Sequence, residues 1–189
     1  MNTCQRQTQK RANFYSKIFM PNLTQKLQKF KDISVKLTLS ERFGDALKIC
    51  EAAIEMLDAS AEKDSPEGIK WLGALESAKA GVFMAQKDFA KAKDAYCAAL
   101  EHIAMLPRGV EFSVALDNLA KAFQGLGDAQ NYISCKLAAL ENLEETAAAS
   151  KGLVAKKYKS LAGEMEALGR SAEAIELRRK AQKIEEGGL

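Results

Sequence analysis

The sequence has 189 residues and a mass of 20.6 kDa, a size that fits one domain or one short repeat array. Apolar residues make up 47% of the chain, which excludes a disordered tail, and three prolines with 7% aromatic residues favour helix over sheet. The net charge of +3 is unevenly spread. Residues 1–31 hold seven basic residues and no acid, whereas residues 32–189 hold 21 basic and 25 acidic residues, so we expect an all-α protein with a basic amino-terminal segment.

Residues 1–26 form this basic leader, and its candidate contact residues are Arg6, Lys10, Arg11 and Lys17. On a helix, its apolar side chains fall on one face: Phe14, Tyr15, Ile18 and Phe19. An acid-free amphipathic pattern is typical of mitochondrial presequences, and it also fits a helix docked on the protein itself, on nucleic acid or on a membrane surface. No apolar run approaches the length of a spanning helix, so we expect an intracellular protein, mitochondrial or cytoplasmic.

Four short turns interrupt the helical periodicity of the remaining chain, beginning at Glu41, Lys87, Gly127 and Gly169, with spacings of 46, 40 and 42 residues. After each turn one stripe recurs at helical spacing. Its last column is alanine in every copy: Ala53, Ala99, Ala139 and Ala181. A small residue in that column lets two helix backbones approach closely. We predict four antiparallel helix pairs, at approximately residues 27–63, 64–107, 108–151 and 152–189.

The third copy is the clearest: it runs from Leu116 to Asp128, with leucine, alanine and phenylalanine at helical spacing before a Gly-Asp turn. This pattern resembles the tetratricopeptide repeat (TPR) family, and the period of about 42 residues resembles the long-helix variety of kinesin light chains. The resemblance implies a right-handed α-solenoid over roughly residues 27–186. It departs from the family at Lys136 and Arg178, where bulky apolar residues are usual.

The resemblance also implies a concave groove lined by the first helix of each pair. Projecting the groove-facing column of the family onto this chain gives the candidate contacts Ser77, Met84, Asp117, Lys121, Gln124, Lys159 and Glu166. These positions are mixed in charge, and ordinary solvated helix surface explains them equally well. Lys31 and Asn118 match two positions that bind acidic chaperone tails in the family, but Val35, Ala78 and Val114 occupy others, so we do not expect that activity.

Residues for catalysis or metal binding are scarce. The single histidine, His102, lies among apolar neighbours, and the chain has no glycine-rich phosphate loop and no His-x-x-x-His pair. The four cysteines, Cys4, Cys50, Cys97 and Cys135, are 46, 47 and 38 residues apart, which is unlike a zinc module. We expect no enzyme activity, no cofactor and no metal.

Two functional hypotheses follow. The first is a non-catalytic scaffold for protein interactions, as a structural or accessory subunit of a larger assembly. The second is a ribonucleoprotein accessory factor, in which the basic leader neutralises RNA phosphates and Phe14 or Tyr15 stacks on bases.

Overall fold

The computed structural model describes residues 23–146 and 149–187. The basic leader up to residue 22 lies outside these residues. Over the described ranges the chain forms eight α-helices and no strand. Their bounds are α2 Leu23–Leu39, α3 Phe43–Asp58, α4 Pro66–Ala85, α5 Phe89–Ala104, α6 Val110–Gly125, α7 Ala129–Glu145, α8 Lys151–Ala167 and α9 Ser171–Glu185.

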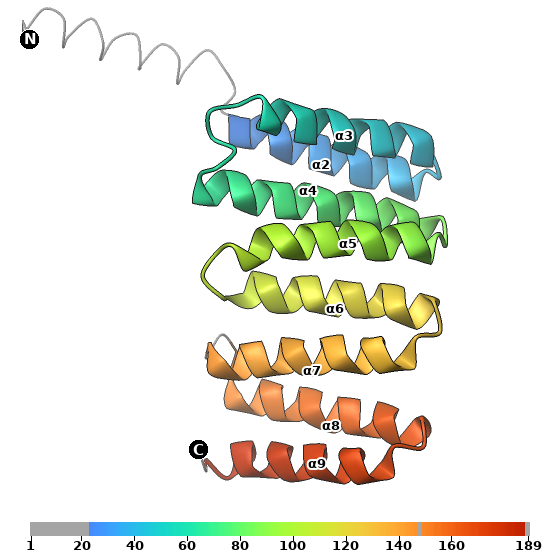
Figure 1. The fold of residues 1–189 in the computed structure, drawn as a ribbon, viewed down its shortest axis with the longest axis vertical. Coiled ribbons are helices and arrows are strands. Elements are labelled where there is room, and N and C mark those ends of the chain that lie inside the picture. Colours follow the sequence, from blue (N-terminus) through green and yellow to red (C-terminus); the bar gives the residue numbers. More distant parts are fainter. Residues whose placement is uncertain (1–22, 147–148, 188–189) are drawn as a thin grey trace, which may run out of the picture.

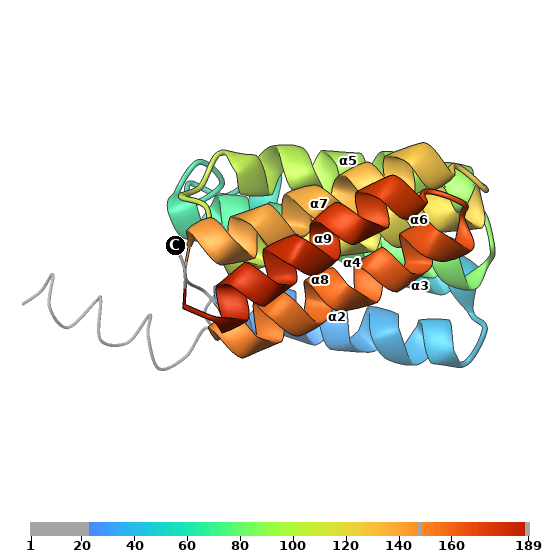
Figure 2. The same ribbon diagram turned by 90° about the horizontal axis from the view of Figure 1, so that it is seen from below.

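The helices form four antiparallel pairs that stack side by side into a solenoid, with tight turns at one end and longer loops at the other (Figure 1). The packing is most extensive within the pairs α4/α5, α6/α7 and α8/α9, whereas α2 packs on α3 about as extensively as α5 packs on α6 of the next pair. Seen along the stack, α8 and α9 cross the earlier helices obliquely, so the pairs rotate as they stack (Figure 2). The predicted all-α solenoid is therefore confirmed.

All four pairs are joined by the same hydrogen-bonded turn. The first residue of each turn has a positive φ: 56° at Glu41, 60° at Lys87, 73° at Gly127 and 77° at Gly169. The next residue donates its N–H across the end of the first helix, as in Arg42 to Leu37 and Asp128 to Phe123, both 2.9 Å. This closure satisfies carbonyls that a helix end leaves free, and it sets the same reversal in every copy.

The start of each second helix is stabilised in one of two ways. Asp88 and Asp128 accept a hydrogen bond from the backbone N–H three residues on, whereas Arg42 and Arg170 form an ion pair with the acid at that position. A first helix starts similarly at Ser65, which accepts from the Gly68 N–H at 3.0 Å. Hydrogen bonds and ion pairs between residues close in sequence thus stabilise the ends of these helices.

The core follows the columns that the sequence repeats. The final alanines of the second-helix stripe, Ala53, Ala99, Ala139 and Ala181, are at most 1% exposed. The first helices carry a small column of their own, formed by Ser34, Ala80, Ala120 and Ala162, which is equally buried, and Ser34 lies against Cys50 of α3. Small residues on both sides permit the close helix crossing within each pair.

Candidate protein-binding groove

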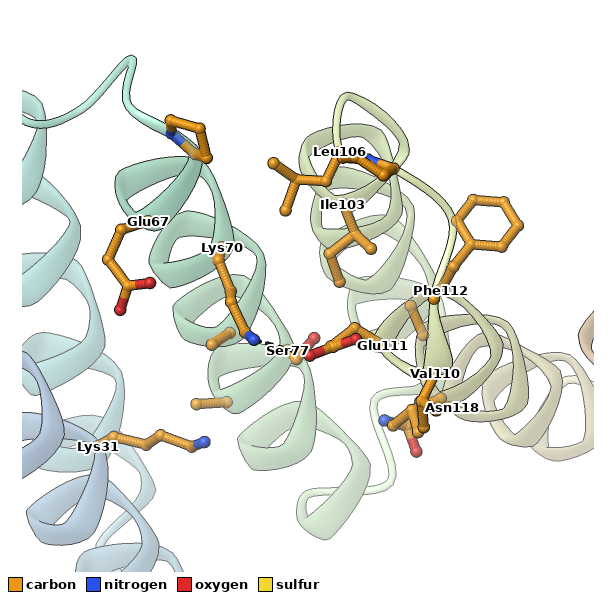
Figure 3. Close-up of a pocket in the computed structure, with 17 residues that line it drawn as sticks. Lys31, Glu67, Lys70, Ser77, Ile103, Leu106, Val110, Glu111, Phe112 and Asn118 are labelled. Atoms are coloured by element: carbon orange, nitrogen blue, oxygen red, sulfur yellow. Dashed lines mark hydrogen bonds and ion pairs between the residues drawn. The ribbon is translucent and has the colours of Figure 1, made fainter. Parts of the chain in front are cut away.

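A groove of about 790 Å³ opens between three successive first helices, α2, α4 and α6. Its lining includes Lys31 of α2, Ala74, Ser77 and Ala78 of α4, and Val110, Val114 and Asn118 of α6. The end of α5 and the loop after it complete one wall with Ile103, Leu106 and Pro107. Figure 3 shows Lys31 on one side of the groove and the α6 side chains on the other.

The groove is accessible and largely apolar. Val110 and Val114 lie one helical turn apart and are 45% and 51% exposed. Opposite them, Ala74 and Ala78 of α4 present only methyl groups, so these side chains leave space between α4 and α6. When a partner covers apolar surface of this kind, binding is favoured by about 25 cal/mol per Å² of surface removed from water.

The charged groups of the groove are few and partly satisfied. Lys70 of α4 donates to Glu111 of α6 at 2.7 Å, across the groove, and this contact holds the pKa of the Glu111 carboxyl below its ordinary value. Both side chains are about half exposed, so the pair contributes little to stability. Lys31 has no hydrogen-bond or ion-pair partner among the described residues. It remains free to meet an anionic group of a ligand.

A buried polar cluster fixes the loop that forms one wall. Asn142 of α7 is 1% exposed, and its Nδ2 donates to the Gly109 carbonyl at 2.9 Å and to Ser113 Oγ at 2.8 Å. Ser113 in turn donates to the Ala139 carbonyl at 2.9 Å. Since Gly109 and Ser113 belong to the start of α6, α7 holds the end of the helix that presents Val110 to the groove.

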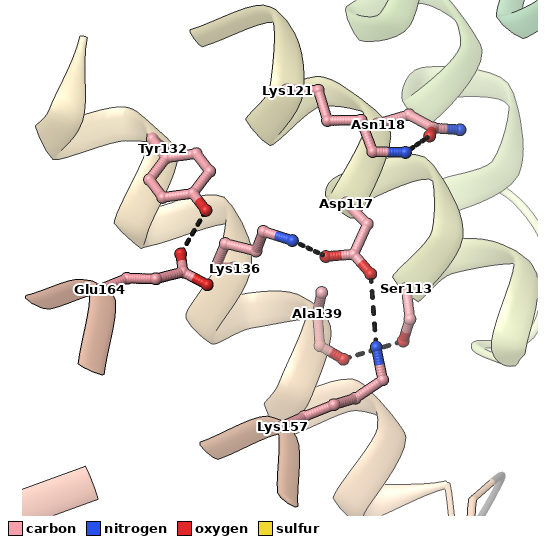
Figure 4. A network of polar contacts seen from close by, with 9 residues as sticks. All are labelled: Ser113, Asp117, Asn118, Lys121, Tyr132, Lys136, Ala139, Lys157 and Glu164. Atoms are coloured by element: carbon pink, nitrogen blue, oxygen red, sulfur yellow. Dashed lines mark hydrogen bonds and ion pairs between the residues drawn. The ribbon is translucent and has the colours of Figure 1, made fainter. Parts of the chain in front are cut away.

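The region between α6, α7 and α8 holds a network of polar contacts (Figure 4). Lys136 of α7 donates to Asp117 Oδ1 at 3.0 Å, and Lys157 of α8 lies 3.9 Å from Asp117 Oδ2. Lys136 and Asp117 are each about three-quarters buried at the side chain. The departure from the family at Lys136 therefore has a structural partner.

Next to this network, the Tyr132 hydroxyl donates to the Glu164 carboxylate. Burial and this contact raise the pKa of Tyr132. Tyr132, Glu164 and Gln124 line a smaller cavity of about 470 Å³ near the turns. Polar side chains of α7 and α8 thus lie against α6 on one side, whereas the side of α6 that faces α4 borders the open groove.

The seven candidate groove residues therefore fall in different surroundings. Ser77 lines the large groove and Gln124 the small cavity, whereas Met84 packs against the core cluster of the second and third pairs. Lys121 is exposed and donates to Asn118 of its own helix.

Candidates of the last pair are engaged within the chain. Lys159 donates to Glu185 at 2.8 Å, and Glu166 accepts from Arg178, so both bridge α8 to α9. Arg178 holds the pKa of Glu166 below its ordinary value. The second departure from the family, Arg178, therefore has a partner too. The structure brings only Ser77 of the seven into the large groove.

The apolar wall of that groove was not among the predicted contacts. Ile103 and Leu106 come from the end of α5 and the following loop, which a projection of first-helix columns leaves out, and Val110 is the first residue of α6. Val110 and Val114 carried a usable signal, because they are aliphatic, one turn apart and outside the buried stripe of α6.

Other chemistry is sparse in the described part of the chain. It contains no group of three or more histidine, cysteine or acidic residues that could hold a metal ion. None of its helices is long and apolar enough to cross a membrane. Cys50 is buried, and burial raises its thiol pKa, as it does for the half-buried Cys97 and Cys135, which disfavours the reactive thiolate.

Comparison with solved structures places the fold among TPR-like repeat proteins. The crystal structure of BtubC (BKLC) from P. vanneervenii superposes with a TM-score of 0.65 at 14% identity, over 89% of this chain and 66% of that one. A putative kinesin light chain of P. anserina with nearly identical TPR-like repeats gives a TM-score of 0.65 at 16% identity, over 90% of this chain and 79% of that one. No family model and no curated protein matches the sequence. At these identities the likeness concerns the fold alone.

Proposed function

We propose that the protein is a non-catalytic scaffold that binds an extended, largely apolar segment of a partner protein in the groove between α2, α4 and α6. The observation that supports this most is the open apolar lining, since Val110 and Val114 of the groove wall are about half exposed. A groove of about 790 Å³ has room for several side chains of a bound segment.

The polar groups of the groove add direction to this binding. Ser77 and Asn118 line its floor and can bond to the backbone of an extended segment, which keeps its peptide groups free for such contacts. Lys31 at the α2 side favours a segment with an acidic group at that end. The Lys70–Glu111 pair crosses the groove and favours a bound segment that passes over it.

We also propose that the partner belongs to a larger assembly in which this protein is an accessory subunit. The supports are the TPR-like scaffold and the scarcity of catalytic groups. The acid-free leader supports a mitochondrial location, which imaging of the tagged full-length chain against a chain that starts at residue 27 would test. RNA binding through Arg6, Lys10, Arg11 and Lys17 stays a prediction from the sequence.

The groove is tested by affinity capture with two matched variants. Val114→Glu places a charge on the groove wall, and Ile175→Glu places the same charge at an equally exposed position of α9, 48% against 51%. We expect Val114→Glu to lose the proteins captured by the wild type and Ile175→Glu to keep them.

Capture is done at moderate salt, with and without nuclease. Retention of the same protein set by Val114→Glu would contradict the groove as the binding site. Release of the set by nuclease would favour the RNA hypothesis instead, since RNA would then connect the proteins.

A further inference from the structure

The smaller cavity, at the end of the solenoid that holds the tight turns, shares no lining residue with the large groove. Its volume is about 470 Å³, and it lies where the end of α6, the start of α7 and the end of α8 meet. Tyr132 and Glu164 are its least exposed lining residues. The other lining residues are exposed: Gln124, Gly127, Ala129, Ala167 and Leu168. The cavity is therefore open to a ligand at the helix ends, apart from the faces along which an extended segment would lie.

One carboxylate of this cavity keeps a charge that no cation of the described chain neutralises. The Tyr132 hydroxyl donates to Oε2 of Glu164. Burial and this contact raise the pKa of Tyr132, so the phenol keeps its proton and acts as a neutral donor to the carboxylate. Glu164 forms no ion pair among the described residues, and its Oε1 accepts no hydrogen bond from them. Oε1 is therefore available to a donor on a ligand.

The nearby lysines of α6 and α7 are directed elsewhere. Lys136 donates to Asp117 at 3.0 Å, and Lys121 donates to Asn118 of its own helix at 3.0 Å. Figure 4 shows both ammonium groups turned towards these partners, whereas Glu164 is turned towards the tyrosine hydroxyl. No lysine lines the cavity, so a ligand cation would meet Glu164 without competition from an ammonium group of the chain.

The helix ends that meet at the cavity also favour a cation. The carboxyl ends of α6 and α8 carry the negative end of the helix dipole, and both ends line the cavity. The amino end of α7 has the opposite polarity, but Asp128 caps it and has no cation partner among the described residues. Arg170, in the turn after α8, is paired with Glu173. The balance of charge around the cavity is therefore negative.

The wall of the cavity at the end of α8 is aliphatic. Leu168 is 49% exposed, and Ala129 and Ala167 add methyl groups to the lining. The same turn position holds Ser40 and Gln86 in the first two pairs, so the turn itself does not require a large apolar side chain. Leu168 thus offers apolar surface for the stem of a ligand.

We propose that this cavity binds a lysine side chain of a partner protein. The ammonium group donates to Oε1 of Glu164 and to the Gln124 amide oxygen, and the methylene stem packs on Leu168. Lysine fits better than arginine because Tyr132 occupies Oε2, so the carboxylate cannot accept the two parallel bonds of a guanidinium group. The negative charge thus selects a cation, and the single free oxygen selects an ammonium group.

The test is an NMR titration of the isotope-labelled full-length chain with the peptide acetyl-Gly-Lys-Gly-amide at constant ionic strength. Two matched peptides carry Nε-acetyl-lysine or arginine at the centre. Glu164→Gln keeps an acceptor for Tyr132 and removes the charge, and its control is Glu141→Gln, at an exposed acid of α7 without an ion pair in the described chain. Leu168→Gln introduces the residue of the second turn. Its control is Leu126→Gln, at the same turn position, 45% exposed and outside the cavity lining.

We expect the lysine peptide to shift the amide signals of residues 127, 129 and 168, and the acetyl-lysine peptide to leave them unchanged. Glu164→Gln should weaken binding of the lysine peptide at least about 5-fold and Leu168→Gln about 3-fold, with both controls equal to the wild type. The arginine peptide should bind the wild type at least about 3-fold more weakly than the lysine peptide.

Absence of these shifts, equal binding of the lysine and acetyl-lysine peptides, or equal loss in Glu164→Gln and Glu141→Gln would overturn the proposal. Binding of the arginine peptide as tightly as the lysine peptide would overturn the selection of an ammonium group. Val114→Glu should bind the lysine peptide as the wild type does, because Val114 lines only the large groove. Loss of binding in Val114→Glu would place the peptide in the groove and overturn the cavity as its site.

Discussion

The spaces on either side of α6 have the same backbone plan and different chemistry. Towards α4 the helix presents Val110, Val114 and Asn118 to an open groove, whereas towards α7 and α8 it presents Asp117 to two lysines. One column of the repeat makes the difference plain. Ser77 lines the groove, its counterpart Asp117 is held by Lys136 and Lys157, and the next counterpart, Lys159, is held by Glu185. Position in the repeat therefore does not by itself make a residue available to a partner.

The cause of the difference lies on the helices that face α6. On α8, Lys157 and Glu164 each find a polar partner on a neighbouring helix, Asp117 of α6 and Tyr132 of α7. On α4, Ala74 and Ala78 are too small to reach α6 and leave the space empty. The amino-terminal half of the solenoid thus leaves an apolar groove open, whereas the carboxy-terminal half joins its helices through internal polar contacts.

The largest expected effect comes from a substitution where α6 and α7 cross. Ala139→Arg forces a long charged side chain into the α6/α7 crossing, where Ala139 is 1% exposed and its carbonyl accepts from Ser113. We expect a loss of about 3–5 kcal/mol in the free energy of unfolding, from overpacking and charge burial. Urea unfolding measures it, with the exposed Ala52→Arg of α3 as control. An unchanged midpoint for Ala139→Arg would mean that the repeat register is wrong.

The second prediction concerns the polar cluster that connects the two regions. Asn142→Ala removes the donor to the half-buried Gly109 carbonyl and to the buried Ser113 hydroxyl. We expect a loss of about 1–3 kcal/mol in unfolding free energy. Hydrogen exchange should also rise at the start of α6, because Asn142 holds that end. A loss of stability with unchanged exchange around Val110 would separate the cluster from the groove wall.

The third prediction uses the titration of a buried tyrosine in the carboxy-terminal half. Burial, with a contact to Glu144, raises the pKa of Tyr158 to about 12. Because the folded chain holds this proton more tightly than the unfolded chain, its contribution is complete below about pH 10 and is lost as the pH rises towards 12. We expect wild type to lose about 2 kcal/mol more than Tyr158→Phe over this range. Parallel losses in urea melts at each pH would contradict the assignment to Tyr158.

The smallest expected effect concerns the ion pair between Lys136 and Asp117. Lys136→Met restores the residue type usual in the family and leaves Asp117 with Lys157 alone. The site is about a quarter exposed, so we expect a change in unfolding free energy of about 1 kcal/mol or less, which shrinks as salt is added. A loss of several kcal/mol would show that the polar network is a main source of stability in that half.

Much of the fold could be predicted because the turns repeat a local signal. Glycine at positions 127 and 169 predicts a left-handed turn residue there. The repeat spacing then locates Glu41 and Lys87, which adopt the same left-handed conformation although they are not glycine. The alanine columns then identify the helix faces that meet. Each of these features depends on residues within one repeat and recurs in the other three.

The groove was less predictable, since its content depends on contacts between copies. Lys136 and Arg178 stood out as departures from the family, but only the packed helices show that they pair with Asp117 and Glu166. The apolar wall from Ile103 to Val110 arises at the end of one pair and the start of the next. A column projected from a single helix carries no information about such a wall.

We propose that partners bind between α2, α4 and α6 and not along the first helices of the whole solenoid. It is tested most directly by placing a photo-crosslinking residue at Ser77 or at Lys159, which occupy the same column in the two halves. We predict that in cells a partner protein crosslinks at position 77 and that position 159 gives no such product. A crosslink to the same partner at 159 with none at 77 would contradict the account.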